Sequence, residues 1–254
     1  MKQNMKQWIA NVIATPKKKA LPVLSFPSIQ LMGITVRDLI SSSDSQARGM
    51  KLIADRVPSA ASVSLMDLSV EAEAFGSAIR FSDDEVPTVQ GRIVTDETDA
   101  EALAIPAVGV ARTGVYVDAI AKAVQLITDR PVFGGVIGPY SLAGRLLDVS
   151  EAMVLCYDEP DMVHTVLEKT TQFLIDYINA YKAVGANGIV MAEPLTGMLS
   201  PALAEEFSAP YVRRIVESVQ SDDFIVIYHN CGNNVLLMSN SIVSTGAAAF
   251  HFGN

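Results

Sequence analysis

Two side chains with strong metal affinity lie two residues apart near the end of the chain. His229 and Cys231 directly follow the apolar run 224–228. Side chains two apart on a strand point the same way, so both can face one point just beyond it. An imidazole nitrogen and a thiolate sulfur are both good zinc ligands. The pair therefore has two interpretations: part of a zinc site, or a buried cysteine and a hydrogen-bonded histidine where a loop begins.

Two acidic residues also follow apolar runs. Asp67 follows residues 61–66 and Glu193 follows Gly188–Ala192. An acid at a strand end can do acid–base chemistry, or it can cap the helix that follows. For Glu193 the alternatives are a zinc ligand, a substrate-binding group, and a helix-capping or salt-bridged carboxylate. Each acid is therefore a candidate for catalysis with a structural alternative beside it.

Five apolar runs alternate with longer helical patterns, and the candidate side chains lie at their ends. The runs are residues 61–66, Val132–Ile137, Gly188–Ala192, 224–228 and 247–252. Nearly continuous apolar runs are typical of parallel strands buried on both faces. The alternation predicts parallel strands with right-handed crossovers. A fifth candidate, His251, lies near the end of the last run; it either faces the same point as His229 or is a core histidine.

The clearest helix precedes the third run. Asp158 is its expected N-cap, and apolar residues recur at three- and four-residue spacing from Val163 to Tyr181. Gly185 is a natural stop. Residues 81–110 interrupt the rhythm because they are polar and acidic, which predicts a solvated loop or an excursion over one end of the sheet. Residues 1–20 mix lysines with a short apolar stretch, which predicts an amphipathic first helix rather than a membrane span or signal peptide.

Composition limits the class of protein. The 254 residues suit one (β/α)-barrel domain over residues 1–254, and 50% hydrophobic with 19% charged residues is an ordinary globular balance. The net charge of -9 disfavours a nucleic-acid surface. Two cysteines, Cys156 and Cys231, define no disulfide framework. We expect a cytoplasmic protein that binds neither nucleic acid nor membrane.

Four sequence blocks, in order, resemble the uroporphyrinogen decarboxylase superfamily. They are residues 67–76 (DLSVEAEAFG), 137–143 (IGPYSLA), 185–194 (GANGIVMAEP) and 229–233 (HNCGN). The resemblance runs from about Val36 to the last residue. The last block is similar to the zinc-binding HxCGN of the methylcobamide:coenzyme M methyltransferases, and it separates that branch from the others.

The resemblance implies a (β/α)8 TIM barrel with its site at the carboxyl ends of the strands. In the methyltransferase branch, zinc binds an acceptor thiol, which attacks the methyl group of a methylcobamide carried by a corrinoid protein. Carried over to this sequence, His229 and Cys231 are zinc ligands, and Glu193 or His251 is a candidate for a further ligand place. Asp67 and Glu193 are the expected catalytic-site acids, which shape the pocket or orient a small thiol substrate.

This sequence departs from the family's pattern in two ways. Family members continue further and supply another zinc-ligating cysteine, whereas only five barrel strands are visible before Asn254. We therefore expect a C-terminally truncated, incomplete barrel, whose open edges pair in a homodimer or are covered by the first helix. Residues 21–32 also lack the arginine-rich segment of true decarboxylases.

Two alternative functions stay open. Asp67 matches the essential aspartate of the decarboxylases, so decarboxylation of a tetrapyrrole such as uroporphyrinogen is one of them. The other is a catalytically inactive, shortened barrel that binds a corrinoid or a protein partner. Metal content and turnover of uroporphyrinogen distinguish the three.

Overall fold

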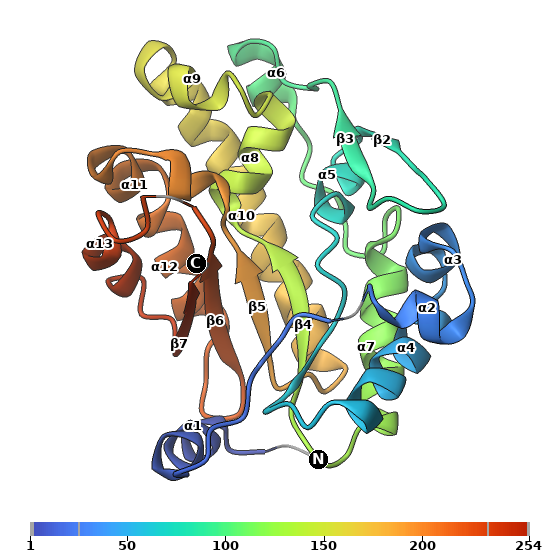
Figure 1. Cartoon of the computed structure of the whole chain (residues 1–254). Helices are drawn as coiled ribbons and strands as arrows, with labels where there is room; N and C mark the ends of the chain where they lie inside the picture. The colour runs from blue at the N-terminus through green and yellow to red at the C-terminus, as the bar shows by residue number, and fades with distance from the viewer. Residues whose placement is uncertain (1–2, 25, 233, 253–254) are drawn as a thin grey trace.

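Five parallel strands form a curved sheet that makes up half of a barrel (Figure 1). The computed structural model describes residues 3–24, 26–232 and 234–252. The strand order is β1–β4–β5–β6–β7. The strands are β1 (Ser62–Val63), β4 (Val132–Ile137), β5 (Gly188–Ala192), β6 (Ile225–Asn230) and β7 (Ala249–Phe252). Four of them lie within predicted apolar runs, and β6 extends two residues beyond its run. The predictions of an α/β fold and of an incomplete TIM-type barrel are confirmed.

The first strand is shorter than its apolar run because a side chain interrupts the ladder. Ser64 still donates its backbone N–H to the Phe133 carbonyl at 3.0 Å. The Gly135 N–H then donates to Ser64 Oγ at 2.8 Å. Regular pairing with β4 therefore ends before the chain reaches Asp67, which lies in a connecting segment rather than on the strand.

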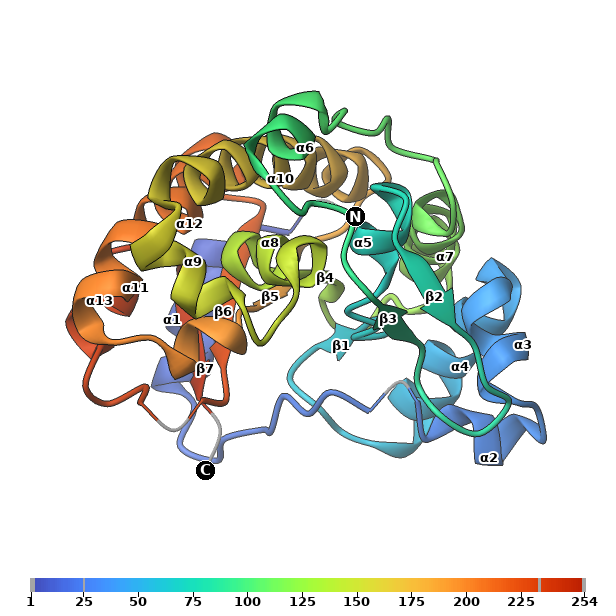
Figure 2. The same cartoon turned by 90° about the horizontal axis from the view of Figure 1, so that it is seen from above.

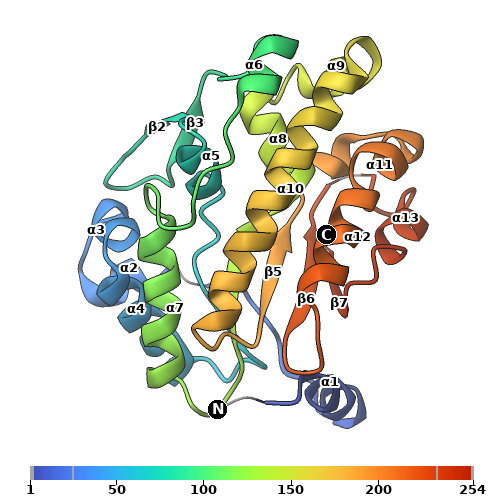
Figure 3. The ribbon, with the colours of Figure 1, turned by 180° about the vertical axis from the view of Figure 1, so that it is seen from behind.

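Long helices cover the convex face of the sheet (Figures 2 and 3). α10 (Pro160–Ala183) contacts β4 and β5, and it lies between α7 (Thr113–Leu126) and α12 (Ala209–Val219). α4 (Ser43–Arg56) packs on α7. Apolar side chains between this layer and the sheet form the larger core.

The helix predicted from apolar spacing is α10, and its two ends differ in how well they were predicted. Asp158 was expected as its N-cap, but this residue ends the preceding helix α9 (Ala152–Asp158), and Glu159 occupies the cap position. The N-cap prediction is therefore wrong by one residue, because the short helix α9 ends only two residues before α10 begins. Gly185 ends α10 as predicted, with a φ of 97° that glycine adopts without strain.

Shorter elements lie beyond the carboxyl ends of the strands, an end that we call the mouth (Figure 2). They are α5 (Val70–Ala74), the hairpin of β2 (Ala78–Arg80) and β3 (Thr88–Gln90), α6 (Glu97–Ala102) and α8 (Pro139–Leu147). Residues 81–110 thus contain β3 and α6 and form an ordered excursion on the mouth side.

The concave face carries a smaller apolar core, which the first helix covers. Met5, Trp8 and Ile9 of α1 (Met5–Ala14) belong to a cluster with Phe133, Val190, Ile225 and Ile227. The Met5 N–H donates to the Asp222 carbonyl at 2.7 Å, which places α1 at the amino end of β6. The predicted first helix is confirmed, and it covers the lower concave face.

Several small helices complete the described structure. They are α2 (Ser28–Met32), α3 (Val36–Ser41), the 3-10 helix η1 (Leu195–Met198), α11 (Pro201–Phe207) and α13 (Ser239–Val243). Among the residues that the structure describes, none of the helices combines the length and the apolar character needed to cross a bilayer.

Candidate active site at the mouth of the half-barrel

The predicted site residues all lie at the mouth, but the fold separates them into two groups. We call Asp67, Glu71 and Glu193, which belong to the part of the sheet from β1 to β5, the carboxylate side. We call His229, Cys231 and His251, which belong to β6 and β7, the histidine side. The sheet order puts β4 and β5 between β1 and β6, so Asp67 and His229 lie at separate parts of the mouth.

The Asp67 carboxylate is fully engaged by neighbouring donors. Its Oδ1 accepts from the Ser69 N–H at 3.1 Å and from Ser69 Oγ at 2.6 Å. Its Oδ2 accepts from the Tyr116 hydroxyl at 2.8 Å and pairs with the Arg112 guanidinium. Asp67 is buried, so these contacts fix its orientation. Its hydrogen bonds with Ser69 fix the turn that leads into α5. Asp67 also lines a pocket at the mouth.

Sequence reasoning missed Arg112, which precedes α7 and holds this side of the mouth together. Its Nε donates to Glu73 at 2.6 Å and its Nη2 to Ser69 Oγ at 2.8 Å. Its guanidinium carbon lies 5.0 Å from the centre of the Phe81 ring. Arg112 lies far from Asp67 in sequence, so no local pattern marks the pair.

Glu71 is a second buried carboxyl group that the sequence did not single out. Its Oε1 accepts from the Ile137 N–H at the end of β4 at 3.0 Å. Its Oε2 has no hydrogen-bond partner among the described residues. Burial raises the pKa of Glu71 to about 7, the Ile137 N–H opposes the rise, and the charge of Asp67 adds to it.

Glu193 caps a neighbouring helix. Its Oε1 accepts from the Tyr140 N–H at 2.7 Å, and its Oε2 accepts from the Ser141 N–H at 2.9 Å and from the Ser141 hydroxyl. These donors form the first turn of α8, whose own cap position is Gly138. A Cβ on Gly138 would lie 2.5 Å from the Glu193 side chain, so the glycine makes room for the carboxylate.

The environment of Glu193 supports the capping alternative from the sequence. The side chain is completely buried, and burial raises its pKa to about 7 against the lowering effect of the Ser141 hydroxyl and the two amides. Glu193 does not line the mouth pocket. Its proposed role as a catalytic acid or zinc ligand stays a prediction.

A pocket of about 490 Å³ lies on the carboxylate side. Its walls are residues 66–69, residues 86–89 of the hairpin, Arg145, and residues 148–150 after α8. The pocket combines apolar side chains with a few charged groups. That is the usual composition of a small-molecule site, and the volume lies in the usual range.

The histidine side contains two imidazoles in contact. His229 and His251 are register partners on β6 and β7, and their Nδ1 atoms lie 2.8 Å apart. His229 Nδ1 also lies 3.1 Å from the His251 carbonyl oxygen. Burial lowers the pKa of the half-buried His229, the His251 carbonyl opposes this, and the charge of His251 adds to it.

Residues 229–232 alternate between side chains that are at least partly exposed and residues that fix the backbone. Cys231 is exposed. Asn230 is buried; its Nδ2 donates to the Glu193 carbonyl at 2.9 Å, and its Oδ1 accepts from the Gly232 N–H at 2.8 Å. A Cβ on Gly232 would lie 2.3 Å from Gly197 Cα, so this glycine allows the backbones to meet. The last residue of the HNCGN block, Asn233, lies outside the described residues.

The part of the chain that the structure describes contains no group of three or more His, Cys, Asp or Glu side chains placed to hold one metal ion. A zinc site needs at least three protein ligands. His229, His251 and Cys231 are therefore a partial donor set, and zinc binding stays a prediction.

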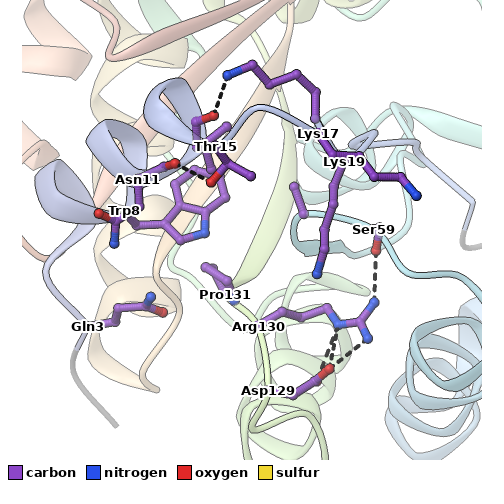
Figure 4. Close-up of a pocket in the computed structure, with 13 residues that line it drawn as sticks. Gln3, Trp8, Asn11, Thr15, Lys17, Lys19, Ser59, Asp129, Arg130 and Pro131 are labelled. Carbon is purple, nitrogen blue, oxygen red and sulfur yellow. Dashed lines mark hydrogen bonds and ion pairs between the residues drawn. The ribbon is translucent and has the colours of Figure 1, made fainter.

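A second pocket, of about 240 Å³, lies at the opposite end of the sheet, beside α1 (Figure 4). Two of the four cations that line it have structural partners. Arg130 pairs with Asp129 at 2.7 Å and donates to Ser59 Oγ at 3.1 Å. Lys18 donates to the Val12 carbonyl at the end of α1 at 2.9 Å. None of the predicted site residues lines this pocket.

The fold and the position of these side chains define an α/β half-barrel of the TIM type with polar groups at the mouth. The family model for uroporphyrinogen decarboxylase (URO-D) matches residues 21–254. The chain therefore belongs to the uroporphyrinogen decarboxylase family, as the four sequence blocks predicted.

Sequence relatives and a solved structure agree with this family and fold. The uroporphyrinogen decarboxylase of Desulfotalea psychrophila is 30% identical over 195 residues, which cover 74% of this chain and 56% of the relative. That of Methylobacillus flagellatus is 27% identical over 66% of this chain and 49% of the relative. This chain thus spans about half the length of these curated relatives. A methyltransferase from Methanosarcina mazei has the same fold, with a TM-score of 0.86 and 22% identity over 97% of this chain and 74% of that chain.

Proposed function

We propose that this protein transfers a methyl group from a methylated corrinoid, carried by a partner protein, to a small thiol. The observation that carries the proposal is the arrangement of His229 and Cys231 at the mouth end of β6. They are the two most metal-avid side chain types, and they lie on the exposed part of the site. The methyltransferase from Methanosarcina mazei, which shares the fold, supports the same reaction class.

His229 and Cys231 of the HNCGN block would hold the metal, and zinc is the metal that an imidazole nitrogen and a thiolate sulfur favour. When bound, zinc lowers the pKa of a thiol and so supplies the thiolate nucleophile. The described residues alone do not complete such a site, and we derive no step through the metal. His251 holds the His229 ring in place, and Asn230 with Gly232 fixes the chain that carries Cys231.

The carboxylate side has a positioning role in this proposal. Asp67 is held by Arg112, Tyr116 and Ser69, so it presents a fixed wall to the pocket. Its donors must be displaced before it can accept a proton, which disfavours a general-base role. Methyl transfer to a thiolate needs no base from the protein, so the arrangement suits that reaction.

Decarboxylation of a tetrapyrrole is the second candidate function. The observation in its favour is that Asp67 lines the mouth pocket, and the sequence relatives are uroporphyrinogen decarboxylases. Arg112 already donates a hydrogen bond to one oxygen of Asp67, so fewer lone pairs of this carboxylate are available to a substrate.

The test offers both substrates to the same preparation. The purified protein, loaded with zinc, is mixed with methylcobalamin and a panel of small thiols, and loss of the methyl–cobalt absorbance is followed. A parallel sample receives uroporphyrinogen. We expect thiol-dependent demethylation and no consumption of uroporphyrinogen. Consumption of uroporphyrinogen with no demethylation would replace our proposal by the decarboxylase function. If neither substrate is consumed, the proposal is wrong.

A further inference from the structure

Three consecutive lysines line the pocket beside α1, at the end of the sheet opposite the mouth (Figure 4). The protein as a whole has a net charge of -9. Lys17, Lys18 and Lys19 therefore concentrate positive charge against the overall balance, and Arg130 lines the same pocket. Asp129 is the one acidic residue among the described lining residues. This pocket therefore attracts an anion that the net charge of the molecule repels.

Arg130 is held by the fold and has few donors left for a ligand. Its side chain is only 13% exposed, and its Nε and Nη2 donate to Asp129 at 3.1 Å and 2.7 Å. Its Nη1 donates to the Val57 carbonyl at 2.7 Å and to Ser59 Oγ at 3.1 Å. Most of the five N–H donors of the guanidinium are thus engaged, so an anion in this pocket has to be bound by the lysines.

The lysine segment is fixed at two points, and two of its side chains are free. Lys18 donates to two carbonyl oxygens in the last turn of α1. The Ala60 N–H donates to the Ala20 carbonyl at 2.8 Å, which ties the segment to the residues before β1. Lys17 and Lys19 are exposed, and neither ammonium group has a hydrogen-bond or ion-pair partner among the described residues. Both are therefore available to an anion in the pocket.

Trp8 gives the pocket an apolar wall on the α1 side (Figure 4). Its indole packs edge-to-face on Phe133, with 5.9 Å between the ring centres, and this contact fixes the ring. Val12 and Pro131 also line the pocket. Its volume of about 240 Å³ is just below the range of about 300–1,000 Å³ that is usual for drug-sized ligands. The pocket therefore suits a single ring with one charged group.

We propose that this pocket binds a phosphate monoester of a small aromatic group. Lys17 and Lys19 hold the phosphate, and Trp8 contacts the ring. Two ammonium groups act as point charges, which suits a phosphate that carries close to two negative charges. A singly charged, planar carboxylate is better matched by the free fork of an arginine, which this pocket does not offer. The site lies at the opposite end of the sheet from the mouth, so it does not rest on methyl transfer, zinc or a corrinoid.

The test is isothermal titration calorimetry of the metal-free protein with phenyl phosphate at constant ionic strength. Phenol tests the ring without the charge, and benzoate tests a carboxylate in place of the phosphate. We expect phenyl phosphate to bind more tightly than either. Trp8 is the only tryptophan in the sequence, so its fluorescence reports on this pocket and not on the mouth. We expect that fluorescence to change with phenyl phosphate and to saturate at the same concentration as the heat of binding.

A double variant tests the two lysines. Lys17→Gln combined with Lys19→Gln should weaken the binding of phenyl phosphate at least about tenfold, the loss expected when charge-assisted hydrogen bonds are removed. The matched control combines Arg48→Gln with Arg92→Gln, which removes the same charge from exposed positions elsewhere and should bind as the wild type does. Arginine at both lysine positions keeps the charge and should keep most of the affinity. All these positions are exposed, so the variants should fold.

Equal affinity of the wild type and the double glutamine variant for phenyl phosphate overturns the proposal. So does a wild-type protein that does not bind phenyl phosphate, or that binds phenol or benzoate as tightly. An equal loss of affinity in the arginine control would show that net charge alone governs binding, which also contradicts a site at Lys17 and Lys19. Binding that leaves the fluorescence of Trp8 unchanged places the ligand elsewhere and has the same consequence.

Discussion

The two sides of the mouth differ in how their polar groups are satisfied. On the carboxylate side, Asp67 and Glu193 are buried, and each of their carboxylate oxygens accepts at least one hydrogen bond. On the histidine side, His251 and Cys231 are exposed and His229 is half-buried. Apart from Glu71 Oε2, the carboxylate oxygens of the first group are bound to the fold, whereas the second group has donor atoms available to an external ligand.

The difference teaches that residues at the same end of a sheet serve different purposes. A buried, hydrogen-bonded acid stabilises the fold and shapes a pocket, but it is poorly placed to exchange partners. β6 shows both purposes within one strand: Tyr228 and Asn230 are buried behind it, and His229 faces the concave side. The alternation of strand side chains puts packing residues on one face of β6 and the proposed metal ligand His229 on the other.

The largest expected effect is from Asp67→Ala. The change leaves the Arg112 guanidinium buried without its main partner, and we expect a loss of about 3–5 kcal/mol in the free energy of unfolding. Urea denaturation measures it. The control is Asp83→Ala, which breaks the exposed pair with Arg37 and should cost at most about 1 kcal/mol. Equal losses in the two variants would show that the carboxylate side is not specially stabilised.

Buried Glu71 predicts a stability that depends on pH. Its folded pKa of about 7 is above the ordinary 4.5, so the folded state holds its proton more tightly. The stabilisation is complete below pH 4.5 and is lost as the pH rises through about 7. It amounts to about 3 kcal/mol, and Glu193 adds a similar amount. Glu71→Gln should therefore flatten the fall in unfolding free energy between pH 5 and pH 8, while exposed Glu217→Gln should leave the slope unchanged.

Removal of the helix cap should cost somewhat less. Glu193→Ala leaves the Tyr140 and Ser141 amides of α8 without acceptors, and we expect a loss of about 2–3 kcal/mol. Glu205→Ala, on the exposed face of α11, is the matched control and should have almost no effect. Thermal unfolding of the two variants measures the difference. An unchanged melting temperature in Glu193→Ala would mean that other groups cap α8.

The smallest expected stability effects are on the histidine side. His229→Ala and Cys231→Ser should each change the free energy of unfolding by about 1 kcal/mol or less, because neither side chain is fully buried. Urea denaturation beside Asp67→Ala makes the comparison direct. A loss as large as that of Asp67→Ala would mean that the histidine side is part of the structural framework.

The sheet and the positions of the candidate residues could be predicted because their signals are local. Apolar runs gave all five strands, and apolar spacing gave α10. Asp67, Glu193 and His229 were placed at the mouth because they follow such runs. Helix boundaries were less secure, as the junction of α9 and α10 at Asp158 shows.

The partners of these residues could not be predicted, because they depend on tertiary contacts. Arg112 meets Asp67 across 45 positions, and Glu193 meets Ser141 across 52. Neither pairing leaves a periodic pattern in the sequence.

The location of the chemistry is the central claim, and the rate of methyl transfer in four variants tests it most directly. His229→Ala and Cys231→Ser are compared with His164→Ala on α10 and Cys156→Ser on α9, all zinc-loaded and at equal folded fractions. Loss of a residue that only supports a metal ligand lowers activity about 10- to 100-fold. We predict that His229→Ala and Cys231→Ser lower the rate by more than this, and that His164→Ala and Cys156→Ser leave it unchanged. Full activity in His229→Ala, equal to that of His164→Ala, would contradict the account.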